Sequence, residues 1–218
     1  MRIGILGTGT VGQTLAGKLL SLGHEITLGS RSTSSPAGLA WAQATGPRGH
    51  SGTFADAAEF GELVINATPG TVALEVLEAA GAQALADKVV VDVSNPLVFA
   101  ADGEVTLDPV NTDSVGERIQ RAFPRSRVVK TLNTLSAPVM VNPGRVPGRH
   151  NLFVAGDDPA AKREVTALLE SFGWPAADIV DLGRIRAARA MEMLMPFWLN
   201  LMRHYGHTDF NYSFQVAD

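Results

Sequence analysis

The fold of this chain is decided by one stretch near its start, Ile3-Gly4-Ile5-Leu6-Gly7-Thr8-Gly9-Thr10-Val11-Gly12. An apolar run ends there in a G-x-G-x-x-G pattern, and the helix-like run Leu15-Ala16-Gly17-Lys18-Leu19-Leu20 follows. Between a strand and a helix, the first glycine permits a tight turn, the second lets the backbone approach a pyrophosphate, and the third allows close helix–strand packing. The N–H groups at the helix start also favour phosphate. Glycines occur in ordinary loops too, but both flanks favour a dinucleotide-binding turn that includes Gly7, Gly9 and Gly12.

The segment after the second predicted strand, Glu25-Ile26-Thr27-Leu28, distinguishes between the two nicotinamide cofactors. NAD-binding folds place an acidic residue there, roughly 20 residues after the glycines, to bond the ribose 2′-hydroxyl. No acidic residue occurs between Glu25 and Asp56, and Arg31 lies there among hydroxyl side chains, which suits a 2′-phosphate. Serine-rich segments are also ordinary loops, and Ser35-Pro36 is typical of a helix start. The missing acid nevertheless predicts NADP(H), bound by Ser30, Arg31, Ser32 and Thr33.

The composition is that of a compact enzyme. The chain has 218 residues with 22 acidic and 18 basic side chains, a net charge of −4 and no long basic run. Neither nucleic acid nor a membrane surface is therefore expected as a main partner. The absence of cysteine excludes disulfides and thiolate chemistry and fits a reducing compartment. Because the first strand begins at residue 2 and Pro196 interrupts the apolar stretch 193–202, we expect no signal peptide, no membrane span and a cytoplasmic location.

Strand and helix signals alternate along the chain, which is typical of a Rossmann-type, doubly wound, mainly parallel α/β sheet with right-handed crossovers. Residues 1–218 are expected to form a single NADP-binding domain, with residues 184–218 as a C-terminal helical extension and tail. The predicted strands cover residues 3–6, 25–28, 63–67, 88–93, 127–132, 151–155 and 177–181, and alternation of Phe210, Tyr212 and Phe214 predicts an edge strand. The predicted helices cover residues 15–20, 35–44, 71–84, 114–123, 157–173 and 184–205, the last kinked at Pro196, and a capping box at Thr53 starts a further short one.

Small polar residues follow three of the predicted strands. The segments are Asn66-Ala67-Thr68-Pro69-Gly70, Asp92-Val93-Ser94-Asn95-Pro96-Leu97 and Lys130-Thr131-Leu132-Asn133-Thr134-Leu135-Ser136. Each segment alone is ordinary turn chemistry. In a doubly wound sheet, however, ligands bind beyond the carboxyl ends of the strands. Three such segments at one edge therefore predict a pocket for a nicotinamide and a second substrate.

The sequence contains no recognisable acid–base or metal machinery. It has no Ser–His–Asp set, no HExxH motif and no metal-ligand cluster. Lys130 is either a proton donor or a structural partner of an anion, and a catalytic role of any of the five histidines also stays open. A ketone reductase needs an acid to protonate an alkoxide, whereas hydride transfer between two cofactors needs mainly positioning. We therefore assign no catalytic residue; Asn133 and Thr134 are candidates for positioning the rings.

The chain resembles the family of coenzyme F420-dependent NADP oxidoreductases, which transfer a hydride between NADP(H) and a deazaflavin. The stretches that carry the resemblance span nearly the whole chain: 1–12, 22–25, 29–31, 66–68, 92–97, 128–134, 156–158 and 168–174. Archaeal members have one more residue in the glycine loop, so the chain is more similar to the bacterial branch. The resemblance implies that Thr8, Thr10, Val11, Ser30 and Arg31 hold NADP and that Ala67 and Thr68 lie beside it. It also implies that Asn95, Pro96, Asn133, Thr134 and Ser136 lie near the stacked nicotinamide and deazaflavin rings.

The C-terminal segment is apolar almost all round between Met191 and Met202 and must be buried on several sides. It forms the roof of the substrate pocket, a dimer interface, or a helix packed on its own sheet. The family resemblance favours a homodimer with this segment near the deazaflavin.

Two classes of function remain. The first is an oxidoreductase that uses NADP(H) with coenzyme F420, or alternatively with a flavin, a ferric chelate, or an imine or carbonyl compound. The second is a non-catalytic module that senses NADP(H) and needs no pocket above the nicotinamide. The polar strand ends and the apolar C-terminal segment favour the enzyme.

Overall fold

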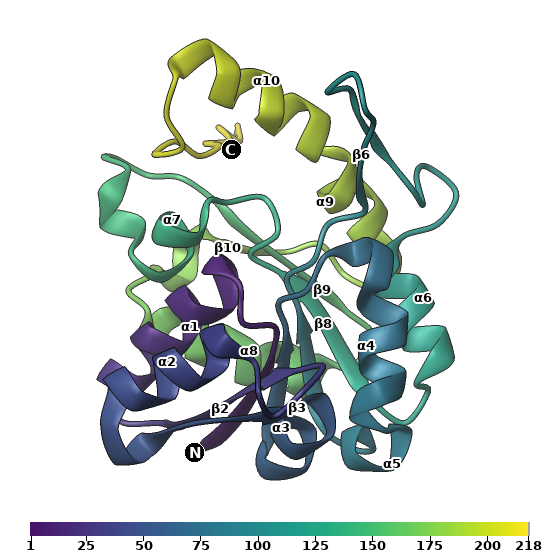
Figure 1. Ribbon diagram of the computed structural model, residues 1–218. Coiled ribbons are helices and arrows are strands. Elements are labelled where there is room, and N and C mark those ends of the chain that lie inside the picture. Colours follow the sequence, from purple (N-terminus) through teal and green to yellow (C-terminus); the bar gives the residue numbers. More distant parts are fainter. Residues whose placement is uncertain (218) are drawn as a thin grey trace.

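The computed structural model describes residues 1–217 and contains one large sheet covered by helices on both faces (Figure 1). The strand order is β10-β9-β8-β5-β4-β1-β2-β3, and all neighbours are parallel except β8 and β9. The predicted doubly wound, mainly parallel fold is therefore confirmed. The strands are β1 (Arg2–Leu6), β2 (Glu25–Ser30), β3 (Gly49–Thr53), β4 (Leu63–Asn66), β5 (Val89–Asp92), β8 (Arg127–Thr131), β9 (Leu152–Gly156) and β10 (Ile179–Asp181), with β6 (Leu97–Phe99) and β7 (Val105–Leu107) forming a separate hairpin.

Helices cover both faces of the sheet because its central strands alternate apolar side chains between two cores. Val89 and Val91 of β5 belong to one core, and Val90 belongs to the other. The first core includes α1 (Thr10–Ser21), α2 (Pro36–Thr45), α7 (Ala137–Val141) and α8 (Pro159–Ser171). The second includes α3 (Phe54–Phe60), α4 (Ala73–Ala80), α5 (Ala82–Leu85) and α6 (Val115–Ala122). The last two helices, α9 (Ala188–Met193) and α10 (Met195–Tyr205), lie above the strand ends in Figure 1.

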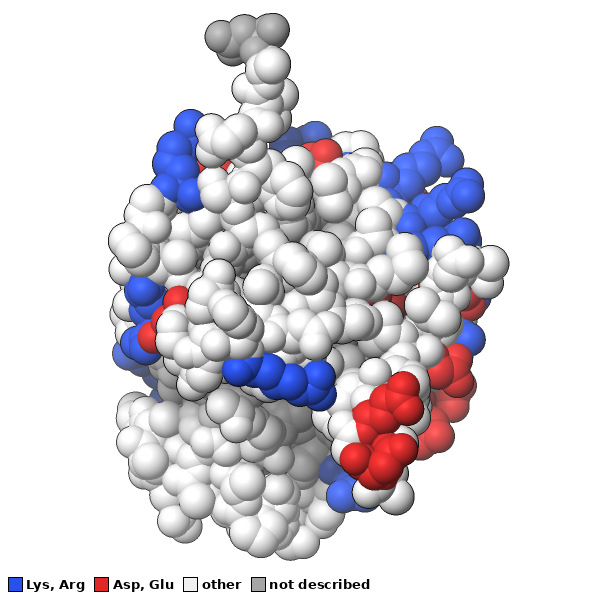
Figure 2. All heavy atoms as spheres, turned by 90° about the horizontal axis from the view of Figure 1, so that it is seen from above, with Lys and Arg blue, Asp and Glu red and all other residues white. Residues whose placement is uncertain are grey.

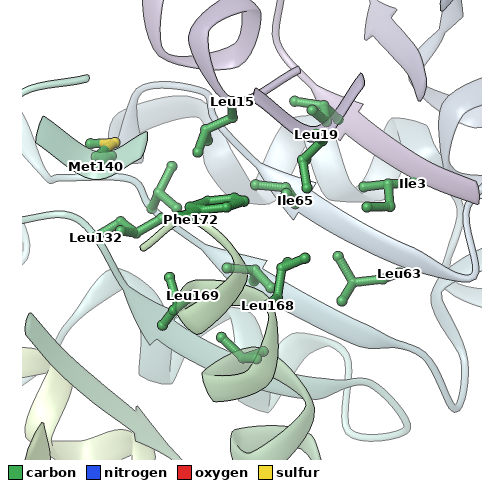
Figure 3. Packing of buried hydrophobic residues seen from close by; sticks show 14 of the residues in the cluster. Ile3, Leu15, Leu19, Leu63, Ile65, Leu132, Met140, Leu168, Leu169 and Phe172 are labelled. Carbon is green, nitrogen blue, oxygen red and sulfur yellow. The ribbon is translucent and has the colours of Figure 1, made fainter. Parts of the chain in front are cut away.

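The first core fixes the position of α1. Leu15 and Leu19 of this helix are fully buried and point toward Ile65 of the sheet and Phe172 at the end of α8 (Figure 3). Burying one such side chain stabilises the fold by about 1.5–3 kcal/mol. The start of α1 is thereby held at the carboxyl end of β1, where the glycine turn lies.

Helix termini predicted from the sequence are confirmed by their hydrogen bonds. Thr53 and Asp56 form a capping box: Asp56 N donates to Thr53 Oγ1 at 3.1 Å and Thr53 N to Asp56 Oδ2 at 2.8 Å. Asp158 caps α8 by accepting from two backbone N–H groups. The helical stretch 184–205 was predicted to be kinked at Pro196; it is interrupted at Leu194, and α10 begins at Met195. Within residues 1–217, no helix is both long and apolar enough to cross a bilayer.

Other elements differ from the sequence prediction. The strand β3, the hairpin β6–β7 and α7 were not predicted, because their short, glycine- or proline-containing sequences carry little periodicity. The predicted helix 71–84 is split at Gly81, whose φ is +93°. The predicted edge strand at 210–214 is wrong: this segment is irregular and contacts Asn151 through Tyr212 O and Phe214 N.

Candidate functional site

The glycine turn joins β1 to α1. Two of its glycines are required by the fold itself, without regard to a ligand. Gly7 has a φ of +119°, and a Cβ there would lie 2.7 Å from the Ala67 carbonyl oxygen. A Cβ on Gly12 would lie 2.1 Å from the Gly7 oxygen, so the third glycine of the pattern allows the helix to begin against the turn. Gly9 differs, because a Cβ there would meet no protein atom within 4 Å. The space beside Gly9 is therefore open to a ligand.

The start of α1 has the properties of an anion site. Gly9 is the N-cap residue, no side chain caps the helix, and its first turn contains no acidic residue. The partial positive charge of the first turn is therefore not neutralised by this helix's own side chains. Gln13 stiffens the turn by donating from Nε2 to the Thr8 carbonyl at 2.8 Å.

A cleft of about 990 Å³ lies beside this turn. Eight residues predicted as binding residues line it: Gly7, Thr8, Gly9, Ser30, Arg31, Ser32, Ala67 and Thr68. Thr10, Val11 and Gly12 belong to the first turn of α1 and lie outside the lining. The remaining walls come from Ser34, Ser35, Pro36, Thr53, Phe54, Pro69, Val72, Glu75, Val76 and Ala79. The part of the lining that α4 and the residue before it contribute was not predicted from the sequence. Its signal is the i, i+4, i+7 spacing of Val72, Val76 and Ala79, which marks one face of a helix.

Arg31 is the one basic side chain in the lining of this cleft. Its loop is folded by short side-chain hydrogen bonds: Ser30 Oγ donates to Ser32 O at 2.6 Å, and the hydroxyls of Ser32 and Ser34 lie 2.8 Å apart. Within residues 1–217, Arg31 makes no ion pair and no side-chain hydrogen bond. An exposed guanidinium beside serine hydroxyls is therefore available to a ligand phosphate.

A buried network of hydrogen bonds starts at the cleft wall. Thr68 Oγ1 donates to Asn66 Oδ1 at 2.6 Å, and Asn66 Nδ2 donates to Asp92 Oδ1 at 2.9 Å. The same oxygen of Asp92 accepts from Ser94 N at 3.2 Å. The ends of β4 and β5 are thereby joined through polar side chains.

Lys130 lies at the centre of this network and is fully buried. Its ammonium contacts Asp92 Oδ2 at 2.8 Å, the Ser94 carbonyl at 2.6 Å and Glu192 Oε1 at 2.8 Å, so all three of its N–H groups are used. Burial alone would lower the pKa of Lys130, but the two carboxylates outweigh burial and raise it. The arrangement supports the ion-pairing role of Lys130, because a buried, charged and fully paired ammonium has no free N–H to offer a ligand.

The predicted ring-positioning residues form a second cluster, beside the cleft. Asn95 Nδ2 donates to Asn133 O at 2.7 Å, and Asn133 Nδ2 donates to Asn95 Oδ1 at 2.9 Å. Gly70 N donates to the Asn95 carbonyl at 2.9 Å, so the segments after β4, β5 and β8 all meet. Leu132, just before Asn133, has a φ of +63°, a conformation that costs about 1–3 kcal/mol at a residue with a side chain. Pro96, Thr134 and Ser136 are buried in the same region.

Three buried oxygens of this cluster have no hydrogen-bond partner among residues 1–217: Ser94 Oγ, Asn133 Oδ1 and Ser136 Oγ. An unpaired buried polar atom costs about 1–3 kcal/mol. These atoms therefore suit a polar ligand group such as a carboxamide.

The histidines lie away from the cleft. His150 is buried and contacts the Pro143 carbonyl and Asn211, and none of the five lines the cleft. In the part of the chain that the structure describes, no group of three or more His, Cys, Asp or Glu side chains is placed to hold a metal ion.

The fold, the glycine turn and the loop around Arg31 together define a class of protein. It is a Rossmann-fold oxidoreductase with a basic, hydroxyl-rich loop at the place where NAD-binding folds have an acidic residue. The profile of the family described as "NADP oxidoreductase coenzyme F420-dependent" matches residues 2–96. The crystal structure of a candidate F420-dependent NADP-reductase from Arthrobacter sp. FB24 is 49% identical, with 99% of this chain and 100% of that chain covered and a TM-score of 0.93. The chain belongs to the family of coenzyme F420-dependent NADP oxidoreductases and is an NADP-dependent oxidoreductase.

Other proteins similar to this chain are named for other reductions. Metalloreductase STEAP3 of Rattus norvegicus is 29% identical over 206 residues, which are 90% of this chain and 38% of that protein. The chain thus spans well under half the length of this relative. An imine reductase from Streptomyces aurantiacus is 22% identical, with coverages of 94% and 64% and a TM-score of 0.63, and shares the fold.

Proposed function

We propose that this enzyme transfers a hydride between NADP(H) and the deazaflavin of coenzyme F420. The family supports NADP(H), and the 49% identity to a candidate F420-dependent NADP-reductase over the whole chain supports the deazaflavin. When bound, NADPH supplies the hydride and the oxidised deazaflavin accepts it, with one proton from solvent completing the reduction. No side chain has to protonate an alkoxide in this reaction, which agrees with a cleft whose lining contains no lysine or histidine.

The residues of the cleft fit the phosphates of NADP(H). The open turn at Gly9 and the uncapped start of α1 would hold the pyrophosphate, with Gly7, Thr8, Thr10, Val11 and Gly12 forming the turn. Arg31, with Ser30 and Ser32, would hold the 2′-phosphate. This assignment stands on the fact that Arg31 has no ion-pair partner within residues 1–217, whereas Lys130, a cation near the site, has three hydrogen-bonding partners.

The nicotinamide and the deazaflavin would lie at the ends of β4, β5 and β8. Ala67 and Thr68 would border the nicotinamide, and Asn95, Pro96, Asn133, Thr134 and Ser136 would position the two rings. The unpaired oxygens of Ser94, Asn133 and Ser136 support this placement, because a carboxamide N–H would give them a partner.

We also propose that the chain is a single domain and that two copies form a homodimer in the cytoplasm. Phe197 of α10 is 54% exposed and Phe214 of the tail is 57% exposed, so the segment 184–218 presents aromatic side chains to solvent. The face of the molecule on which α10 lies is mostly uncharged, with Lys, Arg, Asp and Glu mainly toward its margin (Figure 2). Light scattering on the purified protein distinguishes a dimer from a monomer.

The decisive experiment is stopped-flow absorbance of the protein with NADPH and oxidised coenzyme F420. We expect the deazaflavin band to bleach at the rate at which NADPH is oxidised. FMN, a cyclic imine and a ferric chelate serve as parallel acceptors. Tight NADPH binding without turnover of any of these acceptors would contradict the proposed reaction and leave an unidentified substrate or an NADP(H) sensor.

Ferric reduction is the second candidate, because 90% of the chain aligns with a metalloreductase. Turnover of the ferric chelate with no bleaching of the deazaflavin would replace the first proposal with this one.

A further inference from the structure

Two consecutive residues attach α9 to the strand ends. The Met191 carbonyl accepts a hydrogen bond from Asn133 Nδ2 at 3.1 Å. The next residue, Glu192, lies 2.8 Å from Lys130 Nζ. Asn133 also bonds Asn95, so α9 is linked through Asn133 to the loop after β5.

Glu192 joins three elements through a single carboxylate that is only 2% exposed. Besides Lys130 of β8, it accepts from Val115 N at 3.0 Å and from Gly116 N at 3.2 Å, the first two residues of α6. Both of its oxygens are therefore paired, and the carboxylate lies where the partial positive charge of a helix start favours it. Nothing in this arrangement leaves Glu192 free to bind a ligand.

The contacts of Glu192 continue to the cleft. Lys130 donates to Asp92, Asp92 accepts from Asn66, and Asn66 accepts from Thr68 in the cleft wall. Lys130 also donates to the Ser94 carbonyl, one residue before Asn95. A continuous, buried series of hydrogen bonds thus runs from the C-terminal helices to the wall of the cleft.

We propose that Glu192 is a positioning residue for hydride transfer, which fixes α9, and α10 after it, over the ends of β5 and β8. Hydride transfer requires donor and acceptor rings in close contact, and a displacement of about 1 Å can cost about 100-fold in rate. Helices held by a buried ion pair keep the space between them and the strand ends constant. The link from this geometry to catalysis rests on the proposed function, because it requires that an acceptor ring bind at this edge of the sheet.

A second ion pair provides a matched control. Arg189, one turn earlier on α9, donates to Glu117 of α6 through Nε at 2.7 Å and Nη2 at 2.6 Å. It joins the same two helices as Glu192 but, within residues 1–217, makes no hydrogen bond or ion pair with β5 or β8. If Glu192 only joined α9 to α6, Glu192→Gln and Arg189→Met would behave alike.

The first test compares steady-state kinetics of the two variants with those of the wild-type enzyme. For Glu192→Gln we expect kcat/KM for the acceptor to fall at least tenfold while the Kd of NADPH stays within twofold. For Arg189→Met we expect both quantities to stay within twofold, even if its Tm falls. Glu192→Asp keeps the charge on a shorter side chain and should give a smaller defect of the same kind. It replaces Glu192→Gln in the test if that variant does not fold.

The second test measures the position of α10 without an acceptor. The chain has no cysteine, so Gln43→Cys on α2 and Arg203→Cys on α10, both exposed positions, allow two spin labels to be attached. Labelled chains are diluted with unlabelled protein so that distances within one chain are measured. We expect a narrow distance distribution in the wild type and with Arg189→Met, and a broadened or shifted one with Glu192→Gln.

The outcomes separate this inference from the proposed function. Equal effects of Glu192→Gln and Arg189→Met on the distances would overturn the positioning role. The positioning role would also be overturned if Glu192→Gln lowered NADPH affinity by the same factor as acceptor turnover. A changed distance distribution in a protein that reduces no deazaflavin would retain the role of Glu192 in docking α9 and reject the proposed function.

Discussion

The glycine turn at the start of α1 and the Lys130 network beneath the ends of β5 and β8 are built in opposite ways. At the turn, the groups suited to a ligand have no partner: Gly9 faces open space and Arg31 makes no ion pair within residues 1–217. In the network, every N–H of Lys130 and both oxygens of Glu192 are paired. The two regions lie at the same edge of one sheet.

This difference separates binding from positioning. Buried polar groups are normally hydrogen-bonded, so a polar group left unpaired at a cleft indicates that a ligand completes it. A buried charge whose partners are all protein groups instead fixes the relative position of the elements that carry them. On this basis we propose that Arg31 binds the ligand and that Lys130 and Glu192 hold the site together. Substitutions at the network should therefore change stability first, and substitutions at Gly9 and Arg31 should change affinity alone.

The largest effect is expected from Lys130→Met. This variant leaves Asp92 and Glu192 as buried carboxylates without their cation, which costs about 3–5 kcal/mol. Urea unfolding at pH 7 measures the free energy of unfolding of both proteins. A loss below about 1 kcal/mol, the range of a surface pair, would show that the network is not a buried ion pair in solution.

The difference in stability between the wild type and Lys130→Met should change with pH in one direction. The carboxylates hold the folded-state pKa of Lys130 above its ordinary value of 10.5, although burial opposes them. The stability that the charged lysine contributes is therefore fully present below that ordinary pKa and is lost as the pH rises through the raised one. The difference in unfolding free energy between wild type and Lys130→Met should therefore shrink as the pH rises above 10.5.

The next largest effect is expected from Arg31→Ala. Loss of a charged partner for the 2′-phosphate should weaken NADPH binding by about 1–3 kcal/mol and leave NADH binding nearly unchanged. Isothermal titration with both cofactors measures this, and Arg163→Ala, an exposed arginine of α8 outside the cleft, is the control. An equal loss for NADPH and NADH would remove Arg31 from the 2′-phosphate site.

The sequence predicts the turn and the sheet well because both depend on local patterns. The glycines, the strand before them and the missing acid after β2 all lie within residues 3–35. The strand β3 has the sequence Gly-His-Ser-Gly-Thr, which has little preference for a strand, and it forms because β2 offers an edge to pair with. The hairpin β6–β7 and α7 are similarly short and depend on their surroundings.

The network was less predictable than the turn because its members are distant in the sequence. Lys130 was expected to pair with an anion or to donate a proton, but its partner Glu192 is 62 residues away in a segment notable for its apolar side chains. Asn133 was found because it follows a strand. No periodic pattern marks Glu192, since a single buried acid in an apolar helix is visible only once its partners are known.

The smallest effect, and the sharpest test of the turn, is expected from Gly9→Ala. Gly9 has a φ of −78° and a Cβ there meets no protein atom, so the variant should fold as stably as the wild type. If the open space holds the pyrophosphate, however, the added methyl group should weaken binding of both NADPH and NADH by at least about 1 kcal/mol. Gly17→Ala on the exposed side of the same helix is the matched control, and should stabilise the protein by about 0.5–1 kcal/mol without changing affinity. Unchanged affinity in Gly9→Ala would place the pyrophosphate elsewhere, whereas a loss of affinity together with a loss of stability would mean that Gly9, like Gly7, serves the fold.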